Sequence, residues 1–139
     1  MIILDTNVLS ELMKPVPASV VVAWIGAQPV ADLYTTSITQ AEILHGILLL
    51  PSGRRRRSLE AAATSMFAED FGGRILGFNA ESAQPYARIA SDRMRAGRPI
   101  SHFDAQIAAI ALASRGTLAT RNVADFDGCG VAILDPWAS

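Results

Sequence analysis

The sequence predicts an α/β domain with a parallel sheet. Short apolar runs typical of buried strands alternate along the chain with longer segments of helical period. Strands that are separated by helices pair in parallel through right-handed crossovers. Half of the 139 residues are hydrophobic, which is enough for one filled core, and the length is that of a single domain. We therefore expect one α/β domain over residues 1–139, with four to five parallel strands.

The strands are expected at the short apolar runs. Residues 2–4 are apolar and rich in β-branched side chains, as in a strand buried on both faces. The other strands are expected at 33–36, 75–78, 117–120 and 131–134. Helices are expected between them, at 6–13, 18–27, 37–50, 54–70, 80–96 and 104–114. Thr6 or Asn7 is expected to cap the first helix, and Gly116 lies where the C-terminal cap of the last helix belongs.

The charged residues define a patchy surface without a basic field. The formal net charge is -1, and a single lysine, Lys14, stands against eleven arginines. Four arginines are consecutive at 54–57, and Arg93, Arg95 and Arg98 form a second cluster. Guanidinium groups suit bidentate contact with phosphate, although such runs are equally typical of solvated helix starts. These clusters permit a nucleic-acid partner without requiring one.

Cysteine content and hydropathy exclude several classes of protein. The single Cys129 excludes an internal disulfide and a zinc site with several cysteines, and fits a reducing cytoplasm. The first residues lack the pattern of a signal peptide. No apolar run reaches the roughly 20 residues that cross a bilayer. We expect a soluble cytoplasmic protein with no membrane partner.

Acidic residues near the predicted strand ends are the candidates for chemistry. Parallel sheets bind ligands at the carboxyl ends of their strands. Asp5 follows the first strand, Glu42 lies early in the helix after the second, and Asp125 follows the fourth. Asp104 opens the helix before the fourth strand, and the sequence leaves open whether it reaches the same edge. Converging carboxylates repel one another unless a cation such as Mg²⁺ or Mn²⁺ neutralises them, so phosphodiester cleavage is the first hypothesis.

Each acid also has a structural interpretation. Asp5 could cap a helix, and Asp104 could be a first-turn acid favoured by the helix dipole. Asp125 and Asp127 could be turn residues, and it stays open whether Asp127 contributes to the pocket. The two histidines, His45 and His102, are not expected to be metal ligands. Carboxylate-rich magnesium sites rarely use imidazole.

Five segments, spread over nearly the whole chain, share the motifs of one family. They are residues 1–11, residues 36–46, Leu50-Pro51 with Gly53 and the following arginines, residues 97–101 leading into 104–109, and residues 118–126. In order and spacing they resemble the PIN-domain nucleases, and within these the VapC-type toxins of bacterial type II toxin–antitoxin systems.

The resemblance implies a three-layer α/β/α sandwich and a pocket that binds Mg²⁺ or Mn²⁺. It implies that Asp5 and Asp104 are the central ligands, and that Glu42 and Asp125 complete the catalytic set directly or through water. Supporting polar groups would be Thr6, Asn7, Thr120 and Asn122. His102 departs from the family pattern, and its role stays open.

The resemblance also implies a substrate and partners. Such proteins cleave RNA, often transfer or ribosomal RNA, and so inhibit translation. They form homodimers and are silenced by a cognate antitoxin, through which DNA is contacted only indirectly. The arginines expected to contact RNA are Arg54, Arg55, Arg98 and Arg121.

Three other functions were weighed against a nuclease. An aspartyl-phosphate phosphatase would need a second acid at position 7 and a catalytic lysine, whereas the chain has Asn7 and only Lys14. Glycine-rich nucleotide-binding motifs do not occur. A noncatalytic module that binds an antitoxin within a DNA-bound regulatory complex is the main alternative, and the intact set of acids disfavours it.

Overall fold

The computed structural model describes residues 1–139 and contains a five-stranded sheet. The strands are β1 (Ile2–Leu4), β2 (Leu33–Thr36), β3 (Ile75–Leu76), β4 (Thr117–Ala119) and β5 (Ala132–Leu134), in the order β3-β2-β1-β4-β5. Every neighbouring pair is parallel. The N-terminal strand is central, because Ile2 pairs with Leu33 on one side and with Thr117 on the other. The predicted α/β fold with parallel strands is confirmed.

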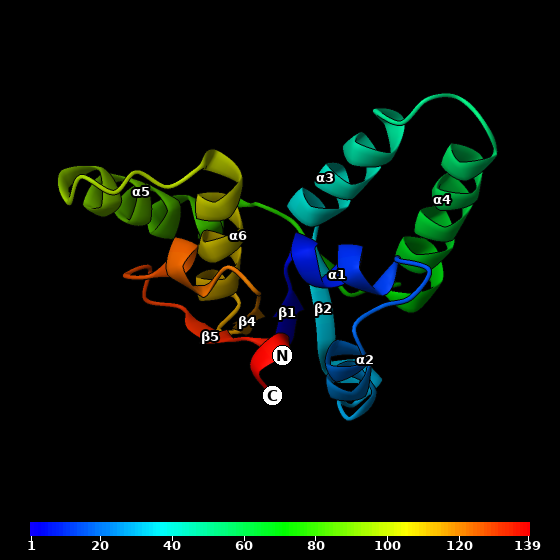
Figure 1. The fold of residues 1–139 in the computed structure, drawn as a ribbon. Coiled ribbons are helices and arrows are strands. Elements are labelled where there is room, and N and C mark those ends of the chain that lie inside the picture. Colours follow the sequence, from blue (N-terminus) through cyan, green and yellow to red (C-terminus); the bar gives the residue numbers. More distant parts are fainter.

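Helices cover both faces of the sheet (Figure 1). One face carries α1 (Thr6–Leu12), α2 (Ser19–Gly26), α3 (Ser37–Leu48) and α4 (Arg54–Ser65). The other carries α5 (Ala80–Arg95) and α6 (His102–Ala113). Four short helical turns complete the chain: η1 (Val30–Asp32), η2 (Met66–Asp70), η3 (Val123–Phe126) and η4 (Pro136–Ala138). The arrangement is the expected three-layer sandwich.

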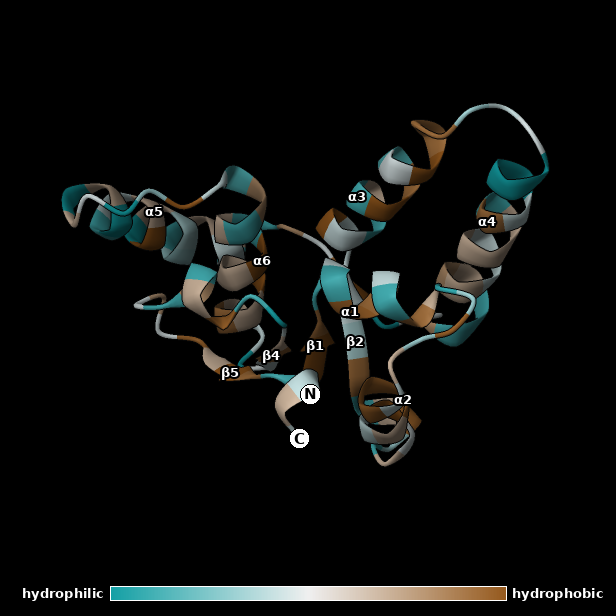
Figure 2. Ribbon diagram, in the orientation of Figure 1, coloured by the Kyte–Doolittle hydropathy of each residue, from teal (hydrophilic) through white to brown (hydrophobic).

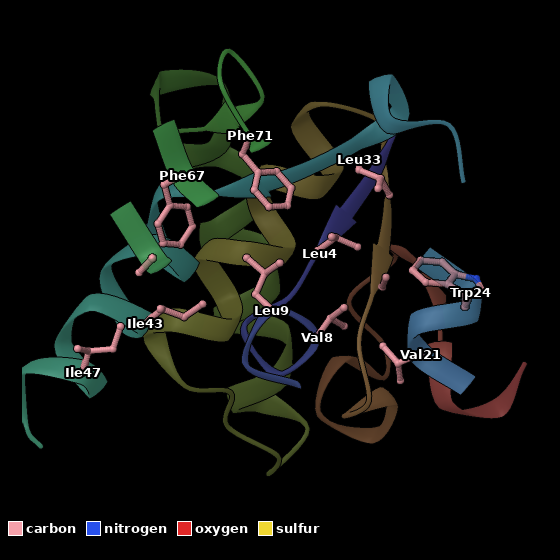
Figure 3. Close-up of a cluster of buried hydrophobic side chains, with 12 residues drawn as sticks. Leu4, Val8, Leu9, Val21, Trp24, Leu33, Ile43, Ile47, Phe67 and Phe71 are labelled. Atoms are coloured by element: carbon pink, nitrogen blue, oxygen red, sulfur yellow. The ribbon is translucent and has the colours of Figure 1, made fainter. Parts of the chain in front are cut away.

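The core is divided by the sheet into two clusters. Successive side chains of a strand point to opposite faces, so Leu4 packs with α1, α2 and α3, while Ile3 packs with α6. Figure 3 shows the first cluster, in which Val8 and Leu9 of α1 lie beside Leu4. Hydrophobic colouring follows β1 and the N-terminal end of β2, whereas the first turn of α4 is hydrophilic (Figure 2). The sheet edge that carries Asp5 is therefore anchored by apolar packing on both sides.

Thr6 and Asn7 do not cap α1, and Gly116 is not the left-handed residue after α6, whereas the alternative that Asp5 caps a helix is confirmed. Asp5 itself caps α1, because its Oδ1 accepts a hydrogen bond from the Thr6 backbone N–H at 2.8 Å. After α6 the left-handed backbone conformation belongs to Arg115, with φ 57°, rather than to Gly116. Gly116 has a different requirement: a Cβ atom there would lie 2.7 Å from Cδ1 of Ile3. The Gly116 N–H donates to the Ala111 carbonyl at 2.9 Å at the end of α6, but it is close packing against β1 that favours glycine at position 116.

The predicted helix ends differ from the structure by a few residues. The α-helical part of α4 ends at Ser65, and the predicted remainder to Asp70 is a π-helical turn, η2. Helix α6 begins at His102, two residues before the prediction, because the Ser101 hydroxyl accepts a hydrogen bond from the Asp104 backbone N–H at 3.1 Å. None of the helices combines the length and the apolar character needed to cross a membrane.

Candidate functional site

The carboxyl edge of the sheet carries a polar pocket of about 420 Å³. Three of the four predicted acids line it: Asp5 at the end of β1, Glu42 in α3 and Asp104 in the first turn of α6. Its other lining residues are Thr6, Asn7, Ser10, Glu11, Lys14, Arg121, Asn122 and Trp137. The fold thus brings together acids that are up to 99 residues apart in the sequence, from Asp5 to Asp104.

Asp5 is the most buried acid of the pocket, with 4% of its surface exposed. Besides the bond to Thr6, its Oδ2 accepts hydrogen bonds from the Thr120 hydroxyl at 2.8 Å and from Nδ2 of Asn7 at 3.2 Å. Burial raises the pKa of Asp5, and the charge of Glu42 raises it further, while the three hydrogen bonds lower it. The three hydrogen bonds hold the carboxylate in place.

The polar residues predicted as supporting groups form one network around Asp5. Thr120 Oγ1 accepts hydrogen bonds from Asn7 Nδ2 and from the Asn122 backbone N–H, both at 3.1 Å. Asn7 Oδ1 accepts one from the Arg121 backbone N–H, also at 3.1 Å. The network connects the end of β1 to the segment after β4, and it fixes the direction in which Asp5 faces the pocket.

Glu42 and Asp104 are half-buried acids on opposite helices. The Thr6 hydroxyl donates to Oε1 of Glu42 at 2.9 Å. Burial raises the pKa of Glu42, and the charge of Asp104 raises it further. Burial also raises the pKa of Asp104, with additional contributions from the charges of Asp5 and Asp125. The three carboxylates therefore repel one another, as expected of acids that share one small pocket.

Asp125 lies in η3 beside the pocket but does not line it. Its side chain is exposed, and its charge contributes to the raised pKa of Asp104. The carboxylate of Asp127 points to Arg98, with Oδ2 3.2 Å from Nη1, so it is engaged at the surface. Of the two aspartates, Asp125 is the one whose charge contributes to the raised pKa of Asp104, and Asp127 is paired with Arg98.

Arg93 is a buried residue whose role sequence reasoning missed. Its Nε donates to the Arg98 carbonyl at 2.7 Å, and its Nη1 to the carbonyls of Asp125 at 2.8 Å and Asp127 at 3.1 Å. The sequence groups Arg93 with Arg95 and Arg98 and predicts either contact with phosphate or a solvated position. Its spacing of four residues from Ile89 puts both on the buried face of α5, and that spacing was the available signal. Arg93 holds the turn that carries Asp125.

Glu11 is a fourth acid in the pocket, and it too was missed. Its Oε1 lies 3.0 Å from Nζ of Lys14, and its Oε2 accepts a hydrogen bond from the Ala18 backbone N–H at 3.0 Å. The hydrogen bond from Lys14 is the main cause that lowers the pKa of Glu11. Positions 7, 10, 11 and 14 share one face at helical spacing, which could have indicated this wall of the pocket.

The four arginines predicted to contact RNA lie in different surroundings. Arg121 lines the acidic pocket, and its Cζ is 5.0 Å from the centre of the Trp137 ring. Arg55 lines an adjoining apolar groove of about 630 Å³, which shares Glu42 with the pocket. Arg54 is exposed at the start of α4, and Arg98 pairs with Asp127.

The predicted metal ligands converge less tightly than a closed cage. No three His, Cys, Asp or Glu side chains come close enough together to enclose an ion. The neighbouring Lys14 is paired with Glu11, and none of Asp5, Glu42 and Asp104 forms an ion pair with a lysine or an arginine. Because Mg²⁺ prefers oxygen ligands and is commonly held by one or two carboxylates and several waters, the donor set fits Mg²⁺ or Mn²⁺. His102 is separate from this set and is hydrogen-bonded to the Tyr86 hydroxyl at 2.8 Å.

A parallel sheet between helical layers and acids at its carboxyl edge define an α/β protein with an acidic pocket. The family model for the PIN domain matches residues 2–127, so the chain belongs to the PIN-domain family.

Relatives cover the full chain. The chain is 37% identical over 137 residues to "VapC ribonuclease Y4jK" of Sinorhizobium fredii, covering 99% of this chain and 98% of the relative. It is 39% identical over 137 residues to "Toxin FitB" of Neisseria gonorrhoeae, covering 99% of each chain.

Two solved structures match the fold of this chain. FitAcB from Neisseria gonorrhoeae matches with a TM-score of 0.93 and 38% identity over 100% of both chains. A structure of FitAB bound to the IR36 DNA fragment matches with a TM-score of 0.92 and 39% identity, covering 99% of this chain and 96% of that one.

Proposed function

We propose that this protein is a metal-dependent endoribonuclease and the toxin of a toxin–antitoxin pair. The observation that carries the proposal is the group of three carboxylates, Asp5, Glu42 and Asp104, which line one pocket without a paired cation. The names of the relatives, a VapC ribonuclease and a toxin, support the substrate class and the biological role.

Asp5 and Asp104 would hold Mg²⁺ or Mn²⁺, with Glu42 and Asp125 completing the site directly or through water. The ion would lower the pKa of water and neutralise the charge that builds on the scissile phosphate. Hydrolysis adds this water across one P–O bond of the RNA backbone and leaves one phosphate end and one hydroxyl end.

The surrounding residues orient the acids for this chemistry. Thr120 and Asn7 hold Oδ2 of Asp5, and Thr6 holds Oε1 of Glu42, so neither carboxylate turns freely when the substrate binds. Such hydrogen bonds to metal ligands typically change metal affinity or activity by about 10- to 100-fold when removed.

Incubation of purified, antitoxin-free protein with total RNA tests the proposal. We expect cleavage with Mg²⁺ or Mn²⁺ and none in EDTA. Asp5→Asn and Asp104→Asn should each reduce the rate by at least about 10²-fold, since they remove more than a supporting hydrogen bond. RNA that stays intact with both metals would disprove the nuclease. Sequencing the 5′ ends of the products would identify the RNA.

Binding of an antitoxin is proposed on a separate observation. The apolar groove beside the acidic pocket is walled by Met13 of the segment after α1, by Ile43 and Ile47 of α3 and by Leu59 of α4. Amphipathic peptide helices bind such grooves through their apolar faces. The structure of FitAB with DNA supports a partner protein through which DNA is contacted.

The noncatalytic alternative makes a distinct prediction. A protein that binds a partner tightly yet leaves RNA intact with both metals would be a binding module. We also propose a homodimer, and light scattering of the purified protein would measure its mass.

A further inference from the structure

The most unusual wall of the acidic pocket is a cation–aromatic pair. Arg121 follows β4, and Trp137 lies in η4 after β5, so the adjacent strand ends bring the two side chains together. The Arg121 Cζ lies 5.0 Å from the centre of the Trp137 ring, within the range of a cation–π interaction. Trp137 is the single hydrophobic residue among the eleven that line the pocket.

Trp137 is held firmly from behind. Its backbone N–H donates to Oδ1 of Asp135 at 2.9 Å, and the preceding Pro136 is buried. The indole packs against the core cluster that contains Val21 and Trp24 of α2. The ring is therefore a fixed surface, while the guanidinium that rests on it is exposed to solvent.

Arg121 differs from the other cation of the pocket. Lys14 is paired with Glu11, whereas the Arg121 guanidinium makes no ion pair. The Arg121 backbone is fixed at the same time, because its N–H donates to Oδ1 of Asn7 at 3.1 Å. Its fork of N–H donors is thus available to an anion in the space that the three acids share.

We infer that Arg121, held in place by Trp137, binds a backbone phosphate of single-stranded RNA beside the acids. The inference rests on the proposed function, and it adds Trp137 as a positioning residue that acts through Arg121. A planar guanidinium binds phosphate in a bidentate manner, and a stacked guanidinium loses less conformational freedom when it does so. The pocket then has two charge zones, acids for a cation and Arg121 for the next anionic group of the substrate.

The experiment uses a fluorescent single-stranded oligouridylate and the full chain. Steady-state cleavage with Mg²⁺ or Mn²⁺ gives KM and kcat, and binding in EDTA at several salt concentrations gives Kd. The variants are Arg121→Ala, Trp137→Leu, Trp137→Phe and the double variant Arg121→Ala/Trp137→Leu. Arg88→Ala, an exposed arginine of α5 outside the pocket, is the matched control for loss of one positive charge.

We expect Arg121→Ala to weaken binding and raise KM by about tenfold or more, as for a charged hydrogen bond. It should also reduce the salt slope of binding by about 0.7, the value for one phosphate of a single strand. Trp137→Leu should raise KM about three- to fivefold with little change in the salt slope. Trp137→Phe keeps an aromatic ring, so its KM should lie closer to that of the wild type. Arg88→Ala should leave KM and the slope near wild type.

Three results would overturn parts of the inference. Equal KM and salt slope in Arg121→Ala and Arg88→Ala, with wild-type cleavage intact, would refute phosphate binding and leave the nuclease standing. The second result is a KM effect of Trp137→Leu that is as large in the Arg121→Ala background as in the wild type, with thermal melting showing that the variants fold. That result would refute a positioning role of Trp137 through Arg121. A wild type that neither cleaves nor binds the probe would refute both the inference and the proposed function.

Discussion

Two kinds of carboxylate line the same pocket, and their pKa values are shifted in opposite directions. Burial and mutual repulsion raise the pKa of Asp5, Glu42 and Asp104. Glu11 has a lowered pKa, because Lys14 and the Ala18 backbone N–H stabilise its charge. Acids with raised pKa values and no ion pair are typical of functional sites, whereas Glu11 connects α1 to the residue before α2 through the Ala18 backbone N–H. The difference separates the acids of the site from an acid of the scaffold.

Metal binding should give the largest effect that distinguishes these acids. A ligand at 100 times its Kd stabilises the folded state by about 2.7 kcal/mol, so saturating Mg²⁺ or Mn²⁺ should raise the wild-type melting temperature by several degrees. Asp104→Asn should lose most of this shift, and Glu11→Gln should retain it. Differential scanning fluorimetry against a metal-free baseline measures both, and equal shifts in the two variants would remove the distinction.

Stability without metal should change in opposite directions in the same two variants. Asp104→Asn removes a charge that repels Asp5, so the melting temperature in EDTA should rise by up to a few degrees. Glu11→Gln removes the charge that Lys14 stabilises, so the melting temperature should fall. Thermal unfolding followed by circular dichroism measures the two shifts. A fall in Asp104→Asn would argue against repulsion among the acids.

The two kinds of acid should affect the free energy of unfolding in different pH ranges. Asp5, Glu42 and Asp104 retain protons in the folded state that the unfolded chain releases, because their pKa values are raised above 3.8 or 4.5. The free energy of unfolding should therefore fall as pH rises from these ordinary values through the raised ones. Glu11 contributes stability above its ordinary pKa of 4.5, and this contribution is lost as pH falls through its lowered pKa.

Melting curves in EDTA over a pH series test both windows. Asp104→Asn should flatten the decline in stability above pH 3.8, the ordinary pKa of an aspartate, and Glu11→Gln should flatten the loss of stability below pH 4.5. A wild-type stability that increases steadily with pH through the upper window would contradict the raised pKa values.

The smallest effect is expected at the surface pair beside the site. Arg98 and Asp127 are both exposed, with Nη1 3.2 Å from Oδ2, and such pairs typically contribute less than about 1 kcal/mol. Arg98→Ala should therefore change the midpoint of urea unfolding only slightly. Arg93→Ala removes the buried guanidinium that donates to the Arg98, Asp125 and Asp127 carbonyls, and a loss in Arg98→Ala comparable to that in Arg93→Ala would show that the pair also holds the turn.

Local rules were enough to predict part of this site. Asp5 directly follows β1 and Glu42 lies early in α3, which follows β2, and both could be placed because the carboxyl ends of β1 and β2 lie at one edge of the sheet. Asp104 could not be placed without its resemblance to a family, because its position depends on how α6 packs against α5 and the sheet. The same limit applies to Arg93, whose partners are carbonyls 5 to 34 residues away in the sequence.

The position of Trp137 in the pocket could not be predicted from the sequence. Its position in the pocket depends on β5 pairing beside β4 and on η4 packing against α2, neither of which any local pattern specifies. The misplaced caps have a similar origin. Asp5 is both cap and candidate ligand, and Gly116 is explained by its contact with Ile3, which is remote in sequence.

The central position of β1 determines when the pocket can exist during synthesis. Asp5 is made first, yet the Thr120 hydroxyl that holds it lies 115 residues later, and Trp137 later still. Contacts of such sequence separation form late in folding. The acid pocket is therefore incomplete on a growing chain until β4 and η4 have been synthesised, so the pocket assembles only when almost all of the chain has been made.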